Sequence, residues 1–447
     1  MYSQQSNTAP GVNAGVPAET YIPMKEVARH NLAQDAWVVV DGKVYEELFG
    51  PIHPPGTLEN NLAPEHFKGV IDPAEAEQQK LKNARDGLPA VETMLGIDEL
   101  EEAAKSCMTA RAVDYYSAGS CDGFSVANNK ESFRKCRLVP RVLRDVSSIR
   151  PQTKIFGIES PLPIYVAPAS NAVLGHPDGE LNITRGASAT GIVQAVSAAA
   201  SYSLTDILDE KDRVDEESGR KMGMVYQVYF QRDRSKTEAQ VREAVEGGVQ
   251  ALVLTVDSNV GDNRQSTEKL KGSRGSAEPG VHMDPITTTP TFHDSRLNWT
   301  DIPWLQELAD GLPIYLKGVC HIDGGRQLDQ ARSGFESLRS IHAEDPQLLK
   351  DFEVYVDGGV RRGSDVLKAL AFGARGVGLG RPFLYAQAAY GDQGVIRAVR
   401  TRRSALTLLV PTTVLENEIV TGMRLLGLKS IDEITPSMAE CLQEVWK

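Results

Sequence analysis

The chain of 447 residues exceeds the length at which one hydrophobic core usually stops growing, so it predicts a large domain with a smaller one. Its formal net charge of −12 argues against a nucleic-acid partner, because such proteins gather Lys and Arg on one face. The sequence holds no apolar run approaching the roughly 20 residues that cross a bilayer, which argues against a membrane-spanning protein.

The start of the chain, residues 1–20, is predicted to be a disordered leader. It is rich in polar residues, Pro and Gly and lacks the Arg of a mitochondrial presequence, and residues 444–447 form no peroxisomal signal. The cytoplasm is therefore the expected location. The cysteines form no C-x-x-C pair, so we expect reduced, buried thiols. They are Cys107, Cys121, Cys136, Cys320 and Cys441.

A charged, Gln-rich stretch predicts a linker at 69–93, between a short unit at 21–68 and a long unit at 94–447. In the long unit, near-continuous hydrophobic runs end in polar or glycine residues, as is typical of parallel strands buried on both faces. The seven runs lie at 163–168, 192–197, 224–229, 251–257, 313–318, 353–357 and 376–380.

Helical patterns follow these runs, for example at 237–246 and 364–372, so the predicted fold is an α/β TIM barrel. A closed barrel of this kind has eight strands. The interval from 313 to 353 contains no further apolar run, so one βα unit is predicted to be missing there. Residues 257–312 are polar and too long for an ordinary connection, and predict a mobile loop over the active face. The apolar segment 405–414 interrupts a final helix and has no functional interpretation.

The last two predicted strands end in glycine-rich turns. The first turn, 356–365, reads VDGGVRRGSD, and the second, 376–383, reads GVGLGRPF. Barrels bind phosphate at this place with glycine N–H groups and a helix N-terminus. Arg361 and Arg381 would add bidentate hydrogen bonds, so the pairing of the two turns predicts a phosphate site.

These turns resemble those of the FMN-dependent 2-hydroxy-acid oxidising family, which includes glycolate oxidase, lactate oxidase and flavocytochrome L-lactate dehydrogenase. The resemblance covers roughly residues 96–428 and includes DYYSAG at 114–119 and PRVLRDVS at 140–147. It implies a TIM barrel of the FMN-linked type that oxidises a small L-2-hydroxy acid to the 2-oxo acid. It further implies a homotetramer and transfer of electrons to cytochrome c or O2, with some relatives in the mitochondrial intermembrane space.

The resemblance also implies which residues hold FMN. Lys317 matches the lysine beside flavin N1, where a fixed ammonium stabilises the negative charge that develops as the flavin accepts electrons. The other matching positions are Pro168, Ala169, Ser170, Ser197, Gln227, Thr255, Asp357, Gly359, Arg361, Gly380 and Arg381.

Further matches concern the substrate. Tyr115 and Arg326 would bind the substrate carboxylate, Arg326 in a bidentate manner, and Tyr229 would face the hydroxyl. Asp257 and Arg264 occupy the family's T-V-D…R pattern, although the usual proline is here Asn259.

The sequence departs from the family at the residue that removes the substrate proton. The expected text is S-N-H-G-G-R-Q-L-D, but this chain reads VCHIDGGRQLD at 319–329, so Asp323 stands where histidine belongs. Asp323 is a candidate base by chemical type, but Asp257 would repel its charge and favour its protonation. His321 is a second candidate, two positions upstream. The helix and strand that should precede this motif are missing, in agreement with the strand count.

The short unit resembles a truncated cytochrome b5-like haem domain. Residues 21–31 and 37–45 match its opening, and His53 matches its second axial ligand. The H-P-G-G loop with the first axial ligand is absent and His30 lies in a helix pattern, so we expect that haem is not bound. The two internal losses suggest a deleted, mis-spliced or misjudged coding sequence, which sequencing of the transcript would test.

Three hypotheses remain open at this point. The first is a 2-hydroxy-acid dehydrogenase or oxidase that uses FMN. The second is a non-catalytic or unstable flavin-binding relative, because a missing βα unit leaves strand edges unpaired. The third is another phosphate-binding barrel such as an inosinate-dehydrogenase relative, but Cys320 lacks the catalytic loop that such an enzyme needs.

Overall fold

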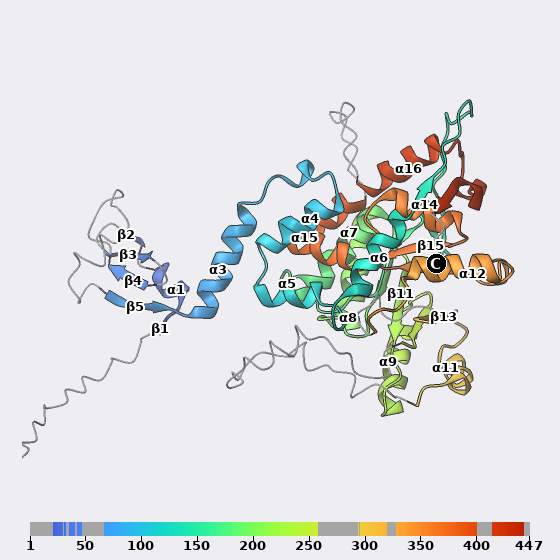
Figure 1. Cartoon of the computed structure of the whole chain (residues 1–447). Coiled ribbons are helices and arrows are strands. Elements are labelled where there is room, and N and C mark those ends of the chain that lie inside the picture. Colours follow the sequence, from blue (N-terminus) through green and yellow to red (C-terminus); the bar gives the residue numbers. More distant parts are fainter. Residues whose placement is uncertain are drawn as a thin grey trace, which may run out of the picture. The chain divides into compact units, whose positions relative to one another are not determined.

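The computed structural model divides the chain into two compact units, Met1–Asp86 and Gly87–Lys447 (Figure 1). The division falls within the linker expected at 69–93. The residues that the structure describes are 21–29, 31–32, 35–40, 43–46, 67–257, 294, 296–319, 328–399 and 414–441.

The first unit contains a five-stranded sheet in the order β1-β5-β4-β3-β2. Its strands β2 to β5 pair antiparallel where they are neighbours, and β1 pairs parallel with β5. A small core joins Ile22, Val27 and Ile71. The long helix α3 has no buried residue, as its charged, Gln-rich sequence leads one to expect. The elements are β1 (Tyr21–Ile22), α1 (Met24–Val27), β2 (Asn31–Leu32), β3 (Asp35–Val40), β4 (Lys43–Glu46), β5 (Phe67–Ile71) and α3 (Pro73–Asp86).

The second unit is built on a parallel seven-stranded sheet in the order β13-β12-β11-β10-β9-β15-β14. Each of the seven predicted runs contains one strand, and the α/β barrel fold is confirmed. The strands are β9 (Ile164–Val166), β10 (Val193–Val196), β11 (Met224–Val228), β12 (Leu252–Thr255), β13 (Ile314–Lys317), β14 (Tyr355–Asp357) and β15 (Gly376–Leu379).

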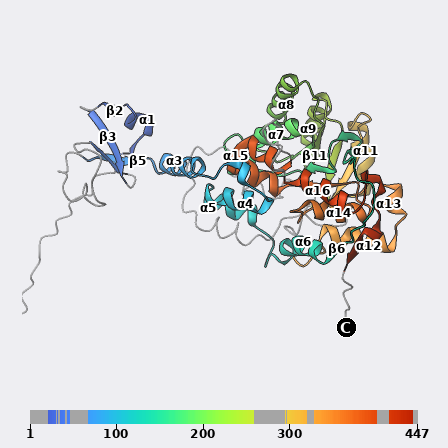
Figure 2. The same cartoon turned by 90° about the horizontal axis from the view of Figure 1, so that it is seen from above.

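Figures 1 and 2 show the helices of this unit ranged around the strands. Helices α8 (Leu204–Ser218) and α12 (Gly334–Glu344) begin with a serine capping box, in which Ser203 pairs with Asp206 and Ser333 with Glu336, so each start is set by its sequence. The larger helices are α4 (Ile97–Ser106), α5 (Ala110–Ser117), α6 (Phe124–Arg134), α7 (Gly179–Thr190), α8 (Leu204–Ser218), α9 (Arg234–Glu246), α12 (Gly334–Glu344), α14 (Gly363–Ala371), α15 (Arg381–Val399) and α16 (Leu415–Leu425).

Side chains alternate along the strands between two cores. One face of the sheet packs against the helices in a large cluster that includes Val196, Leu254 and Val377. The other face forms a smaller cluster with Phe156 and Tyr165 at its centre. This second cluster is the barrel interior, and the same alternation directs one side chain in two from every strand end towards it.

Strands β13 and β14 are the two edges of the sheet and do not pair with each other. The four residues of β13 are only half-buried, whereas those of β12 are all buried. The two edge strands therefore flank the interval in which a βα unit was predicted to be missing. Side chains span this seam: the hydroxyls of Tyr315 and Tyr355 donate to the same oxygen of Glu353, at 3.1 and 2.9 Å.

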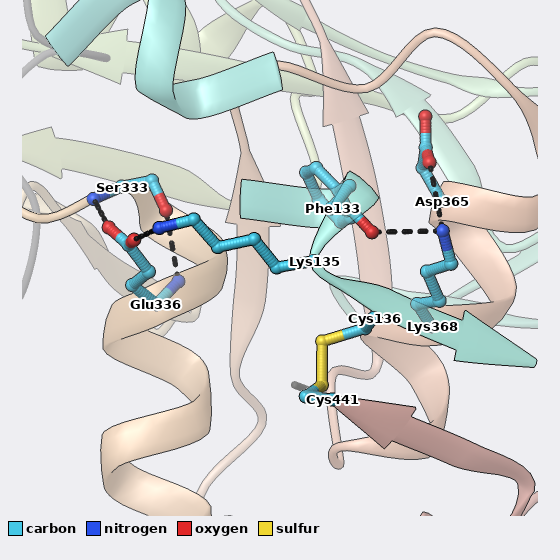
Figure 3. Close-up of a disulfide and its surroundings, with 8 residues drawn as sticks. All are labelled: Phe133, Lys135, Cys136, Ser333, Glu336, Asp365, Lys368 and Cys441. Atoms are coloured by element: carbon cyan, nitrogen blue, oxygen red, sulfur yellow. Dashed lines mark hydrogen bonds and ion pairs between the residues drawn. A yellow bond between two sulfur atoms is a disulfide. The ribbon is translucent and has the colours of Figure 1, made fainter. Parts of the chain in front are cut away.

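Two sequence expectations are wrong. Cys136 of β6 (Cys136–Leu138) and Cys441 of β16 (Ala439–Cys441) form a disulfide between paired antiparallel strands, although we expected thiols (Figure 3). The stretch 257–312, expected to be a loop, contains helix α11 (Ile302–Leu308). Its Pro303 lies in the first turn, where the missing N–H costs nothing. Among the described residues, no helix combines the length and apolar character needed to traverse a membrane.

Candidate active site

Three buried polar side chains form a hydrogen-bonded row across neighbouring strands at their carboxyl ends. The Gln227 side chain on β11 donates from Nε2 to the Thr255 hydroxyl on β12 at 2.7 Å. Its Oε1 accepts from the Ser197 hydroxyl, just beyond β10, at 3.1 Å. Because parallel strands end at one edge of the sheet, three residues far apart in sequence become neighbours.

Lys317 continues this row on β13 and lies across the seam from Asp357 on β14. The Lys317 ammonium nitrogen is 3.9 Å from a carboxylate oxygen of Asp357, and both side chains are largely covered. Tyr165 lies close to the pair: burial raises its pKa well above the usual value, and the Asp357 charge raises it further while Lys317 lowers it. The barrel interior at this level therefore holds a cation, an anion and a neutral phenol.

The segment after β9 contains the predicted flavin contacts Pro168, Ala169 and Ser170. Helix α5 brings Tyr115 to it: the hydroxyls of Tyr115 and Ser170 lie 3.2 Å apart, and the Asn171 amide donates to Tyr115 at 2.7 Å. The structure thus places the predicted substrate-binding tyrosine beside the predicted flavin-binding segment.

The turn after β14 packs closely against helix α6. Gly358 and Gly359 have positive φ values of 90° and 81°. A Cβ on Gly359 would lie 2.0 Å from the carbonyl oxygen of Asn129, so only glycine fits here. The close approach of α6 therefore requires glycine at position 359.

Arg361 is engaged by acidic residues of α4. Its Nη2 lies 2.6 Å from Glu101, and its Nε lies 3.7 Å from Asp98. Burial tends to raise the pKa of Glu101, but Arg361 and Lys105 together lower it below its usual value. The buried Nη1 of Arg361 has no hydrogen-bond partner among the described residues, so the guanidinium can still offer a donor to an anion.

The end of β15 provides open space next to a helix N-terminus. A Cβ on Gly380 would meet only the Cβ of Ala169, at 3.7 Å, whereas one on Gly378 would collide with the Tyr165 ring. Arg381 begins α15 directly after this turn. Backbone N–H groups at a helix N-terminus favour anions, so this space fits the phosphate of a nucleotide.

Tyr229 and Asp257 follow β11 and β12 on the interior side, and both are half-buried. A Cβ on Gly318 would lie 2.3 Å from the Asp257 carboxyl carbon, so this glycine lets the carboxylate lie against the main chain. The remaining predicted residues of the site and of the haem domain, Arg264, Cys320, His321, Asp323, Arg326, His30 and His53, lie outside the described residues.

Two histidines lie in the described part of the chain. The Nδ1 of His176 lies 3.0 Å from the Asn182 amide and accepts from the Asp178 N–H. The ring of His342, on the outer helix α12, packs edge-on against Phe372 at the end of α14. These two residues are thus used in local structure, and neither stands in the row of strand-end side chains.

Sequence reasoning missed the residues that hold the segment after β9 from behind. The Tyr116 hydroxyl donates to the carbonyl of Asn171, and the Gln387 amide donates to that of Ala172, at 2.9 and 2.8 Å. Glu180 accepts from the Ala172 N–H at 3.1 Å. The sequence signal that could have identified Glu180 is that it is the one acidic residue within 179–190.

Known proteins provide comparisons for this geometry. A family model described as FMN-dependent dehydrogenase matches residues 104–324 and 322–441. The two matched segments meet where one βα unit was predicted to be missing.

Two curated relatives and one solved structure are similar to the chain. L-lactate dehydrogenase (cytochrome) of Wickerhamomyces anomalus is 32% identical over 472 residues, covering 93% of this chain and 79% of the relative. L-lactate oxidase of Nostoc sp. is 31% identical over 389 residues, covering 78% of this chain and 99% of the relative. A flavocytochrome b2 mutant with pyruvate bound superimposes with a TM-score of 0.70 at 33% identity, over 83% of this chain and 92% of its own.

Proposed function

Because the chain belongs to the FMN-dependent dehydrogenase family, we propose that it binds FMN and oxidises a small L-2-hydroxy acid to the 2-oxo acid. The observation that carries this proposal is the row of Ser197, Gln227, Thr255 and Lys317 at the ends of successive strands. These side chains bond to one another and still carry further donors and acceptors. A ring system with alternating donors and acceptors, as in isoalloxazine, could bond to them as well.

Different residues would bind different parts of the cofactor. Ser197, Gln227, Thr255 and Lys317 would hold the flavin ring, with Pro168, Ala169 and Ser170 along its face. The phosphate would lie in the space beside Gly380, at the N-terminus of α15, within reach of donors from Arg361 and Arg381. Gly359 and Asp357 would contact the part of the cofactor between ring and phosphate.

Bound FMN supplies an acceptor for the two electrons that leave the substrate, and a second acceptor, cytochrome c or O2, would take them onwards. With FMN bound, the Lys317 ammonium would stabilise negative charge on the ring, and Asp357 beside it would offset part of the charge of Lys317. Tyr115 and Arg326 would hold the substrate carboxylate, with Arg264 nearby, and Tyr229 would face the hydroxyl.

Proton removal is the weak step of the proposed reaction. Asp323 stands where the family has histidine, and Asp257 follows strand β12 of the same barrel. A carboxylate near a second carboxylate is held protonated and accepts a proton poorly. We therefore expect slow turnover, with Asp323 or His321 as the base.

Anaerobic flavin reduction tests the proposal. Protein reconstituted with FMN is mixed with L-lactate, glycolate or (S)-mandelate, and the visible absorption band of the oxidised flavin is followed with time. The proposal predicts bleaching by at least one of these acids and no bleaching by its D-enantiomer where one exists. A yellow protein that no acid bleaches contradicts the catalytic part.

A second candidate is a flavin-binding protein that does not oxidise hydroxy acids. The observation that favours it is the replacement of the expected histidine by Asp323 together with the open edges of β13 and β14. This candidate predicts tight FMN binding without bleaching, so the same experiment separates the two.

We further propose a homotetramer, as the family resemblance implies. We also propose that it binds FMN and no haem, since the sequence lacks the loop with the first axial ligand. Light scattering of the FMN-loaded protein would test the assembly. The visible spectrum would test the cofactor content, because a haem Soret band is easily distinguished from flavin absorption.

A further inference from the structure

The carboxylate of Glu180 lies behind the proposed flavin site, in the first turn of α7. Glu180 is only 3% exposed. One oxygen, Oε1, accepts two backbone hydrogen bonds, from the Ala172 N–H at 3.1 Å and from the Ser201 N–H at 2.9 Å. The second oxygen, Oε2, has no hydrogen-bond partner among the described residues.

The two N–H groups belong to two different strand-end segments. Ala172 follows β9 and closes the segment with Ala169 and Ser170, while Ser201 follows β10 and closes the segment that begins at Ser197. The segments also meet directly, because the Val173 N–H donates to the Ser201 hydroxyl at 3.3 Å. One carboxylate oxygen therefore fixes the relative position of two segments that carry proposed flavin contacts.

Other buried groups complete the support. Gln387 of α15 and Tyr116 of α5 donate to the carbonyl of Ala172, so both the N–H and the carbonyl of that residue are held by side chains. Asn171, next to it, has a positive φ of 59° and donates to Tyr115. Asn tolerates this left-handed conformation better than most residues, so it suits a turn that is held at both sides.

Burying a carboxylate is costly unless hydrogen bonds compensate, and here burial raises the pKa of Glu180 despite the backbone donors. The two N–H groups therefore offset only part of the cost of burial. What distinguishes the bridge is its place, since both segments that it joins carry proposed flavin contacts.

We propose that Glu180 is a positioning residue that sets the spacing of the segments after β9 and β10 for FMN. This inference rests on the proposed function. Glu180 would not touch the cofactor. It would act through Ala172 and Ser201, and so through the residues before them in each segment.

The test compares Glu180→Gln, Glu180→Asp and Glu180→Ala in the full chain. Gln keeps an acceptor oxygen at the same reach, whereas Asp is one methylene shorter and cannot bridge both N–H groups. Two buried donors left without partners predict a loss of about 10- to 100-fold in FMN affinity for the Ala and Asp variants. The Gln variant should stay within about threefold of wild type, since the hydrogen bonds to Oε1 persist.

A matched control is Asp215→Ala. Asp215 is also a buried carboxylate that accepts from a backbone N–H, that of Met222, at 3.1 Å. It lies before β11, at the opposite end of the strands. Asp215 also pairs with Lys211 at 3.0 Å, so urea unfolding of the apoprotein should show a destabilisation at least as large for Asp215→Ala as for Glu180→Ala. Only the Ala and Asp variants of Glu180 should lose FMN affinity and change the shape of the bound flavin band.

The results that would overturn the proposal are distinct. FMN affinity and band shape unchanged in Glu180→Asp, or lost equally in Glu180→Gln, would show that the bridge does not position the site. An equal loss of FMN affinity in Asp215→Ala would show that the loss in the Glu180 variants comes from lower stability alone. A wild-type protein that binds no FMN would overturn the proposed function as well, whereas wild-type binding with unaffected variants overturns this inference alone.

Discussion

Replacing Asp357 by Asn should strengthen the binding of sulfite to the FMN-loaded protein. Sulfite adds to oxidised flavin at N5 and sends negative charge towards N1, where Lys317 is proposed to lie. Asp357 lies 3.9 Å from the Lys317 ammonium and offsets part of its charge. The Asn variant retains the shape and a hydrogen-bonding side chain but removes the countercharge, so the ammonium should stabilise the adduct more strongly.

The magnitude follows from the separation and the exposure of the two groups. Unit charges at this distance interact by about 4 kcal/mol at an effective dielectric constant of about 20. The side chains are 18% and 26% exposed, and ion pairs with access to water are worth about 1 kcal/mol. Taking the lower figure, the sulfite dissociation constant should fall about fivefold.

The assay is an absorbance titration of bound FMN with sulfite, repeated in a Lys317→Met background. Because the effect is assigned to Lys317, Asp357→Asn should change sulfite affinity only where the lysine is present. Asp178→Asn, which breaks a surface ion pair with Arg185, serves as the charge-matched control. The reasoning is refuted if the fivefold gain persists without Lys317, or if the control shows the same gain.

Three further predictions concern the base, the seam and acid stability. Asp323→His should speed the reduction of bound flavin by L-lactate by about 10²- to 10⁴-fold, the usual contribution of a general base, as measured by anaerobic stopped flow; an unchanged rate would place the defect elsewhere. Glu353→Ala should lower the free energy of unfolding in urea by about 1–2 kcal/mol, because Tyr315 across the seam and Tyr355 on the same side both lose their acceptor, whereas Glu159→Ala at the exposed position of β8 (Ile158–Ser160) should change it little. Burial raises the pKa of Glu101, but Arg361 and Lys105 lower it overall, so the contribution of Glu101 to stability is present above its usual pKa of 4.5 and is lost as the pH falls through the lowered value. Glu101→Gln should therefore weaken the pH dependence of unfolding in that range. An acid limb identical to wild type would contradict this.

The strands and the strand-end polar groups could be predicted because both follow from local patterns. A continuous apolar run that ends in a polar residue identifies a buried parallel strand, and parallel strands bring their carboxyl ends to one edge. The neighbourhood of Ser197, Gln227 and Thr255 is a consequence of that rule. The lack of a further apolar run between those at 313–318 and 353–357 could be recognised for the same reason, by counting runs.

Long-range partners could not be predicted in this way. The pairing of Arg361 with Glu101 depends on how α4 packs against the turn after β14, and no period in the sequence encodes that packing. The bridge from Glu180 to Ala172 and Ser201 uses backbone N–H groups, which every residue has. The position of α11 within a polar stretch was missed because its apolar residues are too few to show a helical period.

The disulfide between Cys136 and Cys441 has a consequence for how the large unit can be dissected. The bond joins residues 305 positions apart, and all seven strands of the barrel lie within the enclosed length of chain. A protease that cuts once inside this ring leaves both pieces covalently attached. The nicked molecule would therefore migrate as a single band on a denaturing gel until a thiol reagent is added, and only then separate into fragments.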